Sequence, residues 1–315
     1  MINFIESASS YDLITVLGAT AAGKTAFAAH LANILQSEII SADSRQVYRR
    51  MNIGTGKDYE DYIVNGRQIP VHLIDIVEPG EKYNVYQYQK DFIKVYKSII
   101  GIGKKAIFCG GSGLYIEAVL KDYQLITVPH NEELRWKIEP KTIDELIPIL
   151  ESYKQLHNIS DTNDKERLIR AIEIADYYLN HPDKSEKLGK MKHLVLGVKF
   201  DRNSRRKRIS ERLKSRLTSG MIEEVQELIN SGVSADTLIY YGLEYKFITT
   251  YLQNKISYDE MFKQLETAIH QFSKRQMTWF RRMERNGIEI HWLDGYMSME
   301  QKIARVEEIL RKKNK

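Results

Sequence analysis

The first part of the chain alternates short apolar runs with segments of helical periodicity. Residues 13–17 form an apolar run between Asp12 and Gly18, which predicts a buried strand, and apolar side chains then recur at helical spacing over residues 25–35. By the same criteria we expect further strands over residues 38–41, 71–77 and 106–109, and a helix over residues 84–100. Strands that alternate with helices form a parallel sheet covered by helices. The pattern therefore predicts an α/β core.

The pattern changes after residue 123, where strand-like runs give way to amphipathic segments. Helical periodicity is present over residues 132–138, 143–154 and 165–179. An apolar strand then returns over residues 193–200, and the remainder is expected to be helical, over residues 204–219, 222–230 and a long helix that starts at the capping box Ser257–Glu260. We therefore expect three parts: a core over residues 1–123, an inserted helical domain over 124–190, and a completion of the core over 191–315.

Composition narrows the class of protein. Of the 315 residues, 43% are hydrophobic and 28% are charged, which is typical of a soluble globular protein and excludes a disordered chain. No apolar run reaches the roughly 18 uncharged residues that a membrane span needs, and the first residues lack the pattern of a secretory signal. The single cysteine, Cys109, excludes an internal disulfide and a cysteine-rich zinc site. We expect a cytoplasmic protein without a membrane partner.

The strongest chemical signal lies between the first predicted strand and the first predicted helix. Loops of the pattern G-x-x-x-x-G-K-[ST] surround a phosphate with backbone N–H groups, while the lysine adds a positive charge and the hydroxyl can ligate Mg²⁺. Nucleotide kinases, NTPases and group transferases share this P-loop, so it predicts phosphate binding without naming a reaction. Eight consecutive residues match the pattern: Gly18, Ala19, Thr20, Ala21, Ala22, Gly23, Lys24 and Thr25.

A second polar cluster, residues 41–48, follows the second predicted strand. Ligands of open α/β sheets bind at the carboxyl ends of the strands, so we expect Asp43 to face the bound phosphate. A carboxylate at that position can accept a proton from an attacking nucleophile or hold Mg²⁺ through water. The alternative is that Asp43 caps the helix or turn that follows it.

Basic residues are concentrated in one segment, although the net charge of the chain is only +5. Between Asp201 and Arg216 there are eight basic residues and two acidic ones. Arg208, Arg212 and Arg216 recur at helical spacing beside an apolar stripe. Such a segment suits a polyanion, either a nucleic acid or a phosphorylated small molecule. The alternative is an ordinary solvated helix face.

Several motifs, in the same order along the chain, resemble the bacterial tRNA dimethylallyltransferases. The resemblance covers residues 13–292, nearly the whole chain. It rests on the P-loop and on residues 41–48, 51–55, 72–76, 110–115, Asn163–Asp164 with Arg167, Arg170, Ala171 and Glu173, Arg208 with Arg212, and residues 276–281.

The resemblance implies transfer of a dimethylallyl group from dimethylallyl diphosphate to N6 of adenosine 37 in tRNA, with Mg²⁺ as cofactor. It implies that Asp43 accepts the N6 proton, and that Lys24 and Arg212 act on the diphosphate held by the P-loop. Thr25 would hold the Mg²⁺. We also expect a monomer. By the same resemblance the anticodon stem-loop would contact Asp43, Ser44, Arg45, Gln46, Ser112, Arg135, Glu166, Arg167 and Arg170.

The chain departs from the family's pattern at three places. Residues 57–68 lack the Ala-Lys-Pro that commonly follows Gly-Thr, and residues 241–246 carry extra residues. Arg216 stands where the family has an apolar residue, so we expect it to be a surface residue or an additional phosphate contact. A small-molecule kinase or adenylate prenyltransferase would share the P-loop and Asp43 but would not need the helical insertion. A non-catalytic RNA-binding protein would leave the P-loop unexplained.

Overall fold

The structure is a computed structural model that describes residues 2–153, 164–181, 188–189 and 191–313. It divides into a core unit, residues 1–123 with 188–315, and an insertion unit, residues 124–187. Asn163 and the last residue of the helix expected over 143–154 lie outside the described residues.

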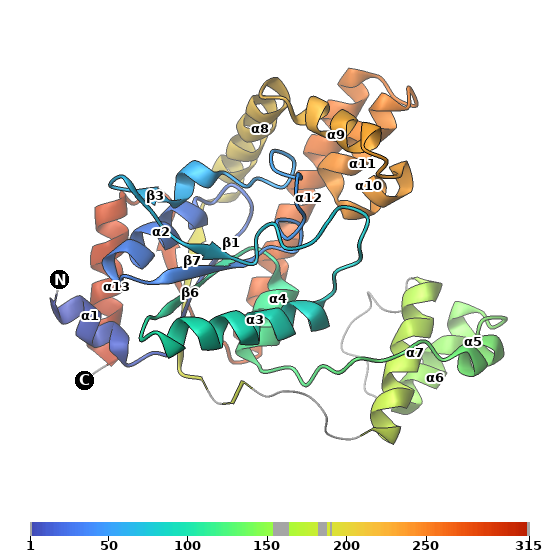
Figure 1. Ribbon diagram of the computed structural model, residues 1–315, viewed down its shortest axis with the longest axis horizontal. Coiled ribbons are helices and arrows are strands. Elements are labelled where there is room, and N and C mark those ends of the chain that lie inside the picture. Colours follow the sequence, from blue (N-terminus) through green and yellow to red (C-terminus); the bar gives the residue numbers. More distant parts are fainter. Residues whose placement is uncertain (1, 154–163, 182–187, 190, 314–315) are drawn as a thin grey trace. The chain divides into compact units, whose positions relative to one another are not determined.

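The core unit contains a six-stranded sheet in which every pair of neighbouring strands is parallel (Figure 1). The order across the sheet is β5-β2-β6-β1-β7-β8. The α/β fold that the sequence predicts is therefore confirmed. The strands are β1 (Leu13–Gly18), β2 (Glu38–Ala42), β5 (Val71–His72), β6 (Ala106–Gly110), β7 (His193–Lys199) and β8 (Ile290–Asp294).

The register of the strands brings three loops to one edge of the sheet. Gly18 at the end of β1 pairs with Val198 of β7, and Gly110 at the end of β6 pairs with Ala42 of β2. A Cβ on Gly110 would lie 2.2 Å from the carbonyl oxygen of Ala42, so only glycine allows this approach. The segments that follow β1, β2 and β6 therefore start side by side.

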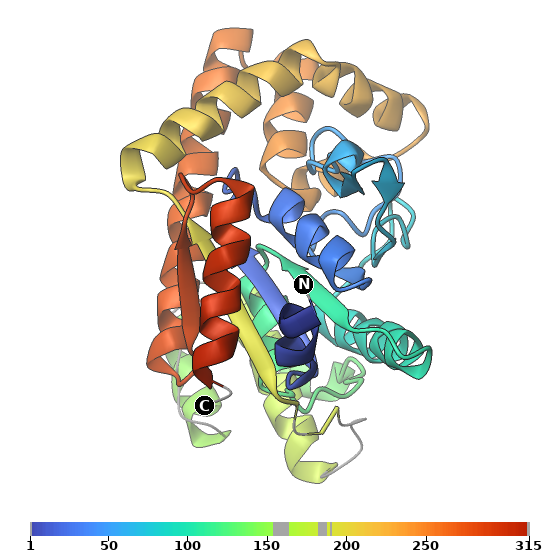
Figure 2. The ribbon, with the colours of Figure 1, turned by 90° about the vertical axis from the view of Figure 1, so that its left-hand side faces the viewer.

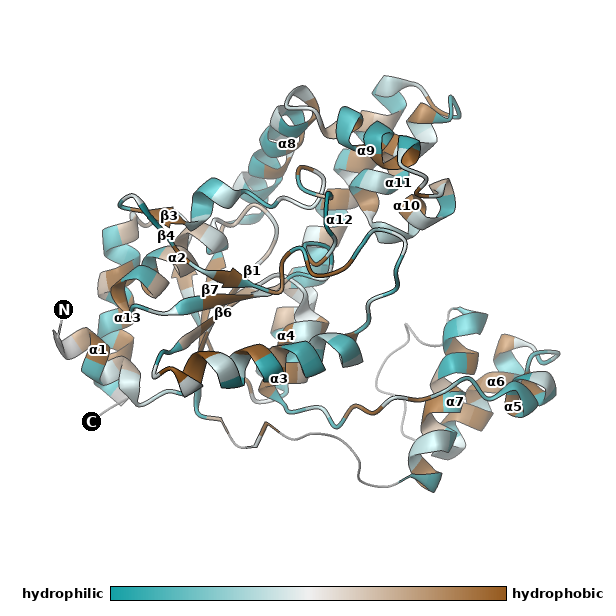
Figure 3. Cartoon of the chain, in the orientation of Figure 1, coloured by the Kyte–Doolittle hydropathy of each residue, from teal (hydrophilic) through white to brown (hydrophobic). Residues whose placement is uncertain are grey.

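Helices cover both faces of the sheet, which makes it the centre of two hydrophobic cores. On one face, α1 (Ile2–Ser9) and α13 (Met299–Lys313) pack against each other beside α2 (Lys24–Ile34) (Figure 2). The other face is covered by α3 (Val85–Gly101), α4 (Gly113–Leu120) and α12 (Tyr258–Arg285). The central strands β1 and β6 are accordingly mostly apolar along their lengths (Figure 3).

A third hydrophobic cluster holds a group of helices that follows β7. Asp201 caps α8 (Arg202–Thr218) by accepting hydrogen bonds from the backbone N–H groups of Asn203 and Ser204. Ile209 and Leu213 of α8 pack in this cluster. Much of the rest of α8 is hydrophilic (Figure 3). The other members are α9 (Met221–Asn230), α10 (Ala235–Tyr241), α11 (Leu243–Leu252) and the first part of α12.

Two predictions about strands are wrong. The strand expected over residues 71–77 ends at His72, because Leu73 (φ 60°) and Asp75 (φ 55°) adopt left-handed conformations that interrupt it. The segment after residue 200, expected to be helical, contains the edge strand β8. Residues 57–68 also contain local structure: a 3₁₀ helix η1 (Tyr59–Tyr62) and the hairpin of β3 (Ile63–Val64) and β4 (Arg67–Gln68).

The insertion unit is helical in its described residues, as the sequence predicts. It contains α5 (Glu132–Ile138), α6 (Ile143–Tyr153) and α7 (Lys165–Asn180), which enclose a small core that includes Leu146 and Ile169. Among all described helices, none combines the length and the apolar character that crossing a membrane requires.

Candidate functional site

The P-loop joins β1 to α2 through two left-handed residues. Ala21 (φ 61°) and Gly23 (φ 73°) turn the chain so that α2 begins at Lys24. A Cβ on Gly18 would lie 2.8 Å from the carbonyl oxygen of Val198, so the loop starts in close contact with β7. The first N–H groups of α2 have no helical partner, and the positive end of the helix therefore points at the space that the loop encloses.

Lys24 brings a partly buried positive charge to the P-loop. Burial lowers the pKa of its ammonium group, and the neighbouring Arg212 and Arg216 lower it further, whereas Cys109 and Asp43 raise it. The ammonium group donates no hydrogen bond to any residue that the structure describes, and neither does the Thr25 hydroxyl. Both groups are therefore available to an anion and its metal counter-ion.

Two arginines of α8 contact the P-loop directly. Arg212 donates a hydrogen bond from Nη2 to the hydroxyl of Thr20, and Arg208 donates from Nε to the carbonyl oxygen of Ala21 (2.9 Å). Burial lowers the pKa of Arg212 to about 10, and the positive charge of Arg216 adds to that shift. Arg208 and Arg212, which the sequence singled out, therefore both lie at the P-loop.

Asp43 follows β2 and combines the two roles that the sequence left open. Its Oδ1 accepts hydrogen bonds from the backbone N–H groups of Arg45 (2.9 Å) and Gln46 (3.4 Å), so it does cap the following turn. Its Oδ2 accepts no hydrogen bond within the described part of the chain. One carboxylate oxygen is thus fixed by the backbone, and the other is available to a substrate or to a metal-bound water.

Residues predicted to contact tRNA surround Asp43. The hydroxyl of Ser112 accepts a hydrogen bond from the backbone N–H of Ser44 (3.0 Å), which joins the loops after β6 and β2. Gln46 donates from Nε2 to the carbonyl oxygen of Gly56 (2.9 Å). Arg45 lies 5.7 Å from the ring centroid of Tyr240, which is exposed. These residues are close together, and their contacts with tRNA stay a prediction.

Gln276 begins the motif of residues 276–281, but the sequence assigned it no role in the site. Its Oε1 accepts a hydrogen bond from the backbone N–H of Thr20 (2.9 Å), and its Nε2 donates to the carbonyl oxygen of Gly111 (3.0 Å). One buried side chain therefore ties the P-loop to the loop after β6. The signal in the sequence is the position of Gln276 in the motif of residues 276–281, which indicates membership of the family but not this bridge.

Glu224 of α9 holds the segment that follows the Asp43 loop. Its carboxylate accepts hydrogen bonds from the backbone N–H groups of Asn52 (2.8 Å), Ile53 (2.7 Å) and Gly54 (3.0 Å). The hydroxyl of Tyr245 donates a further hydrogen bond to it (2.8 Å). Gly54 and Glu224 are 170 residues apart along the chain, so no local pattern could reveal the contact of Glu224 with this segment.

Lys57 fixes the same segment from its other side. Its ammonium group is buried and donates hydrogen bonds to the carbonyl oxygen of Tyr48, to Asn52 Oδ1 (3.3 Å) and to Asp75. Burial lowers the pKa of Lys57, and the hydrogen bond to Asp75 opposes the shift. The left-handed residue Asp75 is thereby held in place.

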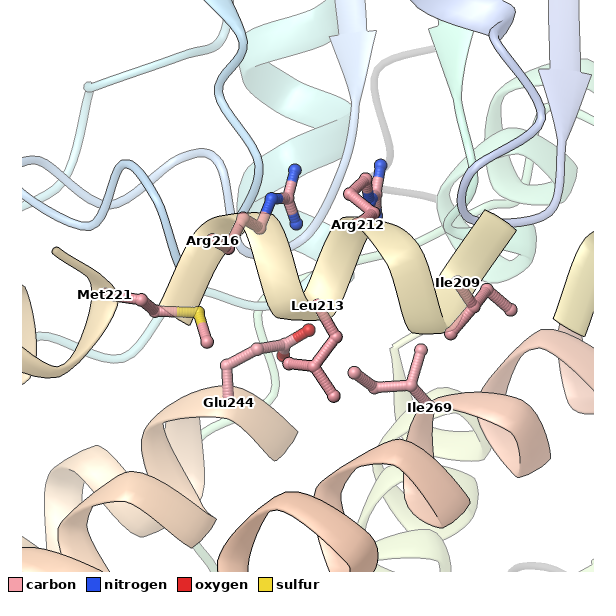
Figure 4. Close-up of a pocket in the computed structure, with 7 residues that line it drawn as sticks. All are labelled: Ile209, Arg212, Leu213, Arg216, Met221, Glu244 and Ile269. Atoms are coloured by element: carbon pink, nitrogen blue, oxygen red, sulfur yellow. The ribbon is translucent and has the colours of Figure 1, made fainter. Parts of the chain in front are cut away.

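A small pocket between α8, α9, α11 and α12 adjoins the arginines (Figure 4). The guanidinium groups of Arg212 and Arg216 lie on the same side of α8, opposite to Leu213, and Glu244 approaches from α11. Burial raises the pKa of Glu244, whereas Arg216 and Arg212 oppose the rise. The remaining residues of the lining are Ile209, Met221 and Ile269.

Cys109 lies under the P-loop at the end of β6. Its thiol is buried and donates to the carbonyl oxygen of Lys24 (3.7 Å). Burial raises the pKa of this thiol to about 12, so it stays protonated at neutral pH. Cys109 is therefore a packing residue of the site.

The insertion unit uses two of its predicted tRNA-binding arginines in an internal ion network. Arg135 donates hydrogen bonds to both carboxylate oxygens of Glu173 (2.8 and 3.0 Å), and its Nη1 lies 3.4 Å from Glu166. Arg170 donates to Glu173 (3.0 Å) and to the carbonyl oxygens of Val128 and Pro129.

Arg167 differs from these two arginines. It is exposed, and its side chain makes no hydrogen bond or ion pair with the described residues. Only its backbone N–H is engaged, by the Asp164 side chain that caps α7 (2.9 Å). Its guanidinium is therefore available to a partner outside the insertion unit.

A parallel sheet covered by helices, with a glycine loop, a lysine and two arginines at its carboxyl edge, defines an α/β protein. Comparison with known proteins narrows this class. The family described as IPP transferase matches residues 46–283. The chain belongs to the IPP transferase family, which confirms the membership that the sequence motifs predict and, with it, the prediction of a transferase.

Individual relatives match over nearly their whole lengths. The chain is 56% identical over 301 residues to tRNA dimethylallyltransferase 2 of Bacteroides fragilis, covering 96% of this chain and 98% of the relative. It is 59% identical over 289 residues to tRNA dimethylallyltransferase 1 of Azobacteroides pseudotrichonymphae, covering 91% and 94%. The crystal structure of the tRNA isopentenylpyrophosphate transferase of Bacillus halodurans is similar with a TM-score of 0.70 at 28% identity, covering 96% of both chains.

The first prediction concerns the Gln276 bridge. In Gln276→Leu, the backbone N–H of Thr20 and the carbonyl of Gly111 lose their buried partner, which costs about 1–3 kcal/mol. Thermal or denaturant unfolding should show a loss of stability of that size. Gln271→Leu, an exposed position on the same helix, is the matched control and should unfold like the wild type. Equal stability of the two variants would contradict the bridge.

The second prediction concerns acid stability of the insertion unit. Burial alone would raise the pKa of Glu173, but hydrogen bonds from Arg135, the N–H of Asn131 and Arg170 lower it to about 2. The ionised Glu173 carboxylate therefore stabilises the folded unit at pH values above 4.5, which is the ordinary pKa of this group. This stabilisation is lost as the pH falls from about 4.5 towards 2.

Hydrogen-exchange mass spectrometry of α7 tests this. We expect the wild type to lose protection on the order of 2–3 kcal/mol across that pH range. Glu173→Gln should be less protected at neutral pH and nearly independent of pH. A wild-type profile that is flat between pH 6 and pH 3 would exclude the ion network as a source of stability.

Proposed function

We propose that the chain transfers a dimethylallyl group from dimethylallyl diphosphate to N6 of adenosine 37 in tRNA and releases diphosphate. The observation that supports this most directly is the arrangement around the P-loop. Lys24 and Arg212 gather positive charge there, and Asp43 presents a carboxylate oxygen that has no hydrogen-bond partner among the described residues. Relatives that share more than half of their residues with the chain are named tRNA dimethylallyltransferases.

The positive groups act on the leaving group. An allylic C–O bond breaks easily when the negative charge that its electron pair leaves on the diphosphate is neutralised. In the proposed reaction the P-loop N–H groups, Lys24 and Arg212 bind that diphosphate. Mg²⁺, when bound, supplies further neutralisation, and the Thr25 hydroxyl together with diphosphate oxygens suits a hard cation that prefers oxygen ligands.

Asp43 acts on the nucleophile. As the lone pair of adenine N6 forms a bond to the allylic carbon, the nitrogen becomes positive and must release a proton. Asp43 Oδ2 accepts that proton, while Oδ1 stays hydrogen-bonded to the N–H groups of Arg45 and Gln46. The two backbone hydrogen bonds therefore fix the direction in which the base faces its substrate.

The RNA that we propose to bind at this site is the anticodon stem-loop of tRNA. Ser44, Arg45, Gln46 and Ser112 surround Asp43, where the reacting base must enter. In the insertion unit, the exposed Arg167 suits a phosphate, whereas Arg135 and Arg170 with Glu166 support the local backbone in addition to any contact with RNA. We further infer that the protein acts as a monomer in the cytoplasm, where its substrate is found.

The basic experiment distinguishes a prenyltransferase from a kinase. The purified protein is incubated with an anticodon stem-loop RNA and either dimethylallyl diphosphate or ATP, each with Mg²⁺. We expect mass spectrometry to find dimethylallyladenosine with the first donor and no consumption of ATP with the second. A protein that hydrolyses ATP and leaves the prenyl donor intact would be a kinase or NTPase instead.

The third prediction separates the two roles of Asp43. Asp43→Asn keeps an oxygen that can cap the turn, since Asn and Asp are nearly equal caps, but removes the basic carboxylate. Single-turnover transfer with saturating substrates should slow by ~10²–10⁴-fold. Thermal stability should change little, whereas Asp43→Ala should lose both stability and rate. A decrease below about threefold in Asp43→Asn would leave Asp43 only the capping role.

The fourth prediction concerns Arg167. Arg167→Ala should weaken tRNA binding and reduce the slope of log affinity against log salt by about one unit, which is the loss of one phosphate contact. The affinity for dimethylallyl diphosphate should stay the same. Lys94→Ala, an exposed position on α3 of the core unit, is the control for loss of one positive charge. Equal salt slopes in wild type and Arg167→Ala would exclude this contact.

A further inference from the structure

Arg216 is buried at the site, although the sequence allowed it to be a surface residue. Only 10% of its side chain is exposed. It lies one helical turn after Arg212 on α8, and both arginines line the pocket of Figure 4. Its guanidinium therefore faces the same region as the group that contacts the P-loop.

The loop after β2 leaves space for this guanidinium. A Cβ on Gly56 would lie 2.2 Å from Arg216 Nη2, so any larger residue would displace the arginine. Gly56 also has a left-handed conformation (φ 73°), which favours glycine. The glycine at position 56 and the arginine at position 216 therefore fit each other in space.

The present partner of Arg216 is an exposed carboxylate. Nη2 donates to both oxygens of Asp58 (3.2 and 3.4 Å), and 52% of the Asp58 side chain is exposed. Nε and Nη1 of Arg216 donate no hydrogen bond within the described residues. The guanidinium thus has unused donors, and its one partner can return to water at small cost.

Three like charges share this region. Arg216 lowers the pKa of Lys24 and of Arg212, which is the effect of a nearby positive charge. Asp43, Asp58 and Glu244 offset part of their mutual repulsion, and what remains favours an anion with more than one negative charge, such as a diphosphate.

We propose that Arg216 is a third positive contact of the diphosphate, and that Asp58 is a stand-in anion which the diphosphate displaces. This inference rests on the proposed function, because that function supplies the diphosphate. It adds a binding residue to Lys24 and Arg212 of the proposed site. In the displaced state Asp58 is solvated, and Arg216 donates to a diphosphate oxygen instead.

A purely structural role is the competing explanation. In that case the pair of Arg216 and Asp58 only fastens the loop of residues 55–62 to α8. Removing either partner would then break the same contact and disturb the site in the same direction. Displacement predicts opposite directions, because Asp58 competes with the ligand while Arg216 binds it.

The experiment measures the affinity of the full chain for inorganic diphosphate by calorimetry, with Mg²⁺ present. We expect Arg216→Met to weaken binding by about 10–100-fold, the loss of a hydrogen bond to a charged group. Asp58→Asn should tighten binding by about two- to fivefold, since it removes a competing negative charge while keeping the shape of the side chain. Lys214→Met, an exposed lysine of the same helix, should bind like the wild type.

Other outcomes overturn the inference. Unchanged binding in Arg216→Met excludes the contact, and Asp58→Asn that binds no tighter than wild type excludes the displacement. Arg216→Lys guards against misfolding, because it keeps the charge and should retain more affinity than Arg216→Met at equal thermal stability. Failure of the wild type itself to bind diphosphate would overturn the proposed function as well, whereas failure confined to Arg216→Met or Asp58→Asn would leave that function intact.

Discussion

The positive charge at the carboxyl edge of the sheet constrains much of the surrounding structure. Burial lowers the pKa of both Lys24 and Arg212, and a neighbouring arginine lowers each further: Arg212 that of Lys24, and Arg216 that of Arg212. A protein can hold such an arrangement only if rigid elements prevent the side chains from turning outward to solvent. The rest of the core unit can be understood as the framework that keeps these charges together until an anion binds.

In that framework, side chains hold the loops in place by hydrogen bonds to the loop backbone. Gln276 ties the P-loop to the segment after β6, and Glu224 binds three successive N–H groups of residues 52–54. Lys57 donates a hydrogen bond to Asp75, a residue of left-handed conformation in a nearby segment. Each of these contacts gives polar groups of a loop a fixed partner, and several of these groups are at least partly buried, so the site is preorganised by hydrogen bonding.

The sequence predicts those features that depend on local pattern. The strands near residues 13, 38, 106 and 193 are apolar runs bounded by polar or glycine residues, and the P-loop is one continuous segment. β8 was missed because its residues, Ile290–Asp294, include half-buried His291 and Trp292 at the edge of the sheet. The bridge of Gln276, the contacts of Glu224 and the partner of Arg216 could not be predicted, because these contacts join residues more than 150 positions apart and no motif pairs those residues.

The burial of Cys109 has a practical consequence for studying the protein. Since the only thiol of the chain is shielded beneath the P-loop and has a pKa of about 12, it offers almost no thiolate to maleimides or iodoacetamides at neutral pH. A cysteine introduced at any exposed position would therefore be the sole reactive one. The chain is in effect a ready background for single-site attachment of dyes or spin labels, without prior removal of a native residue.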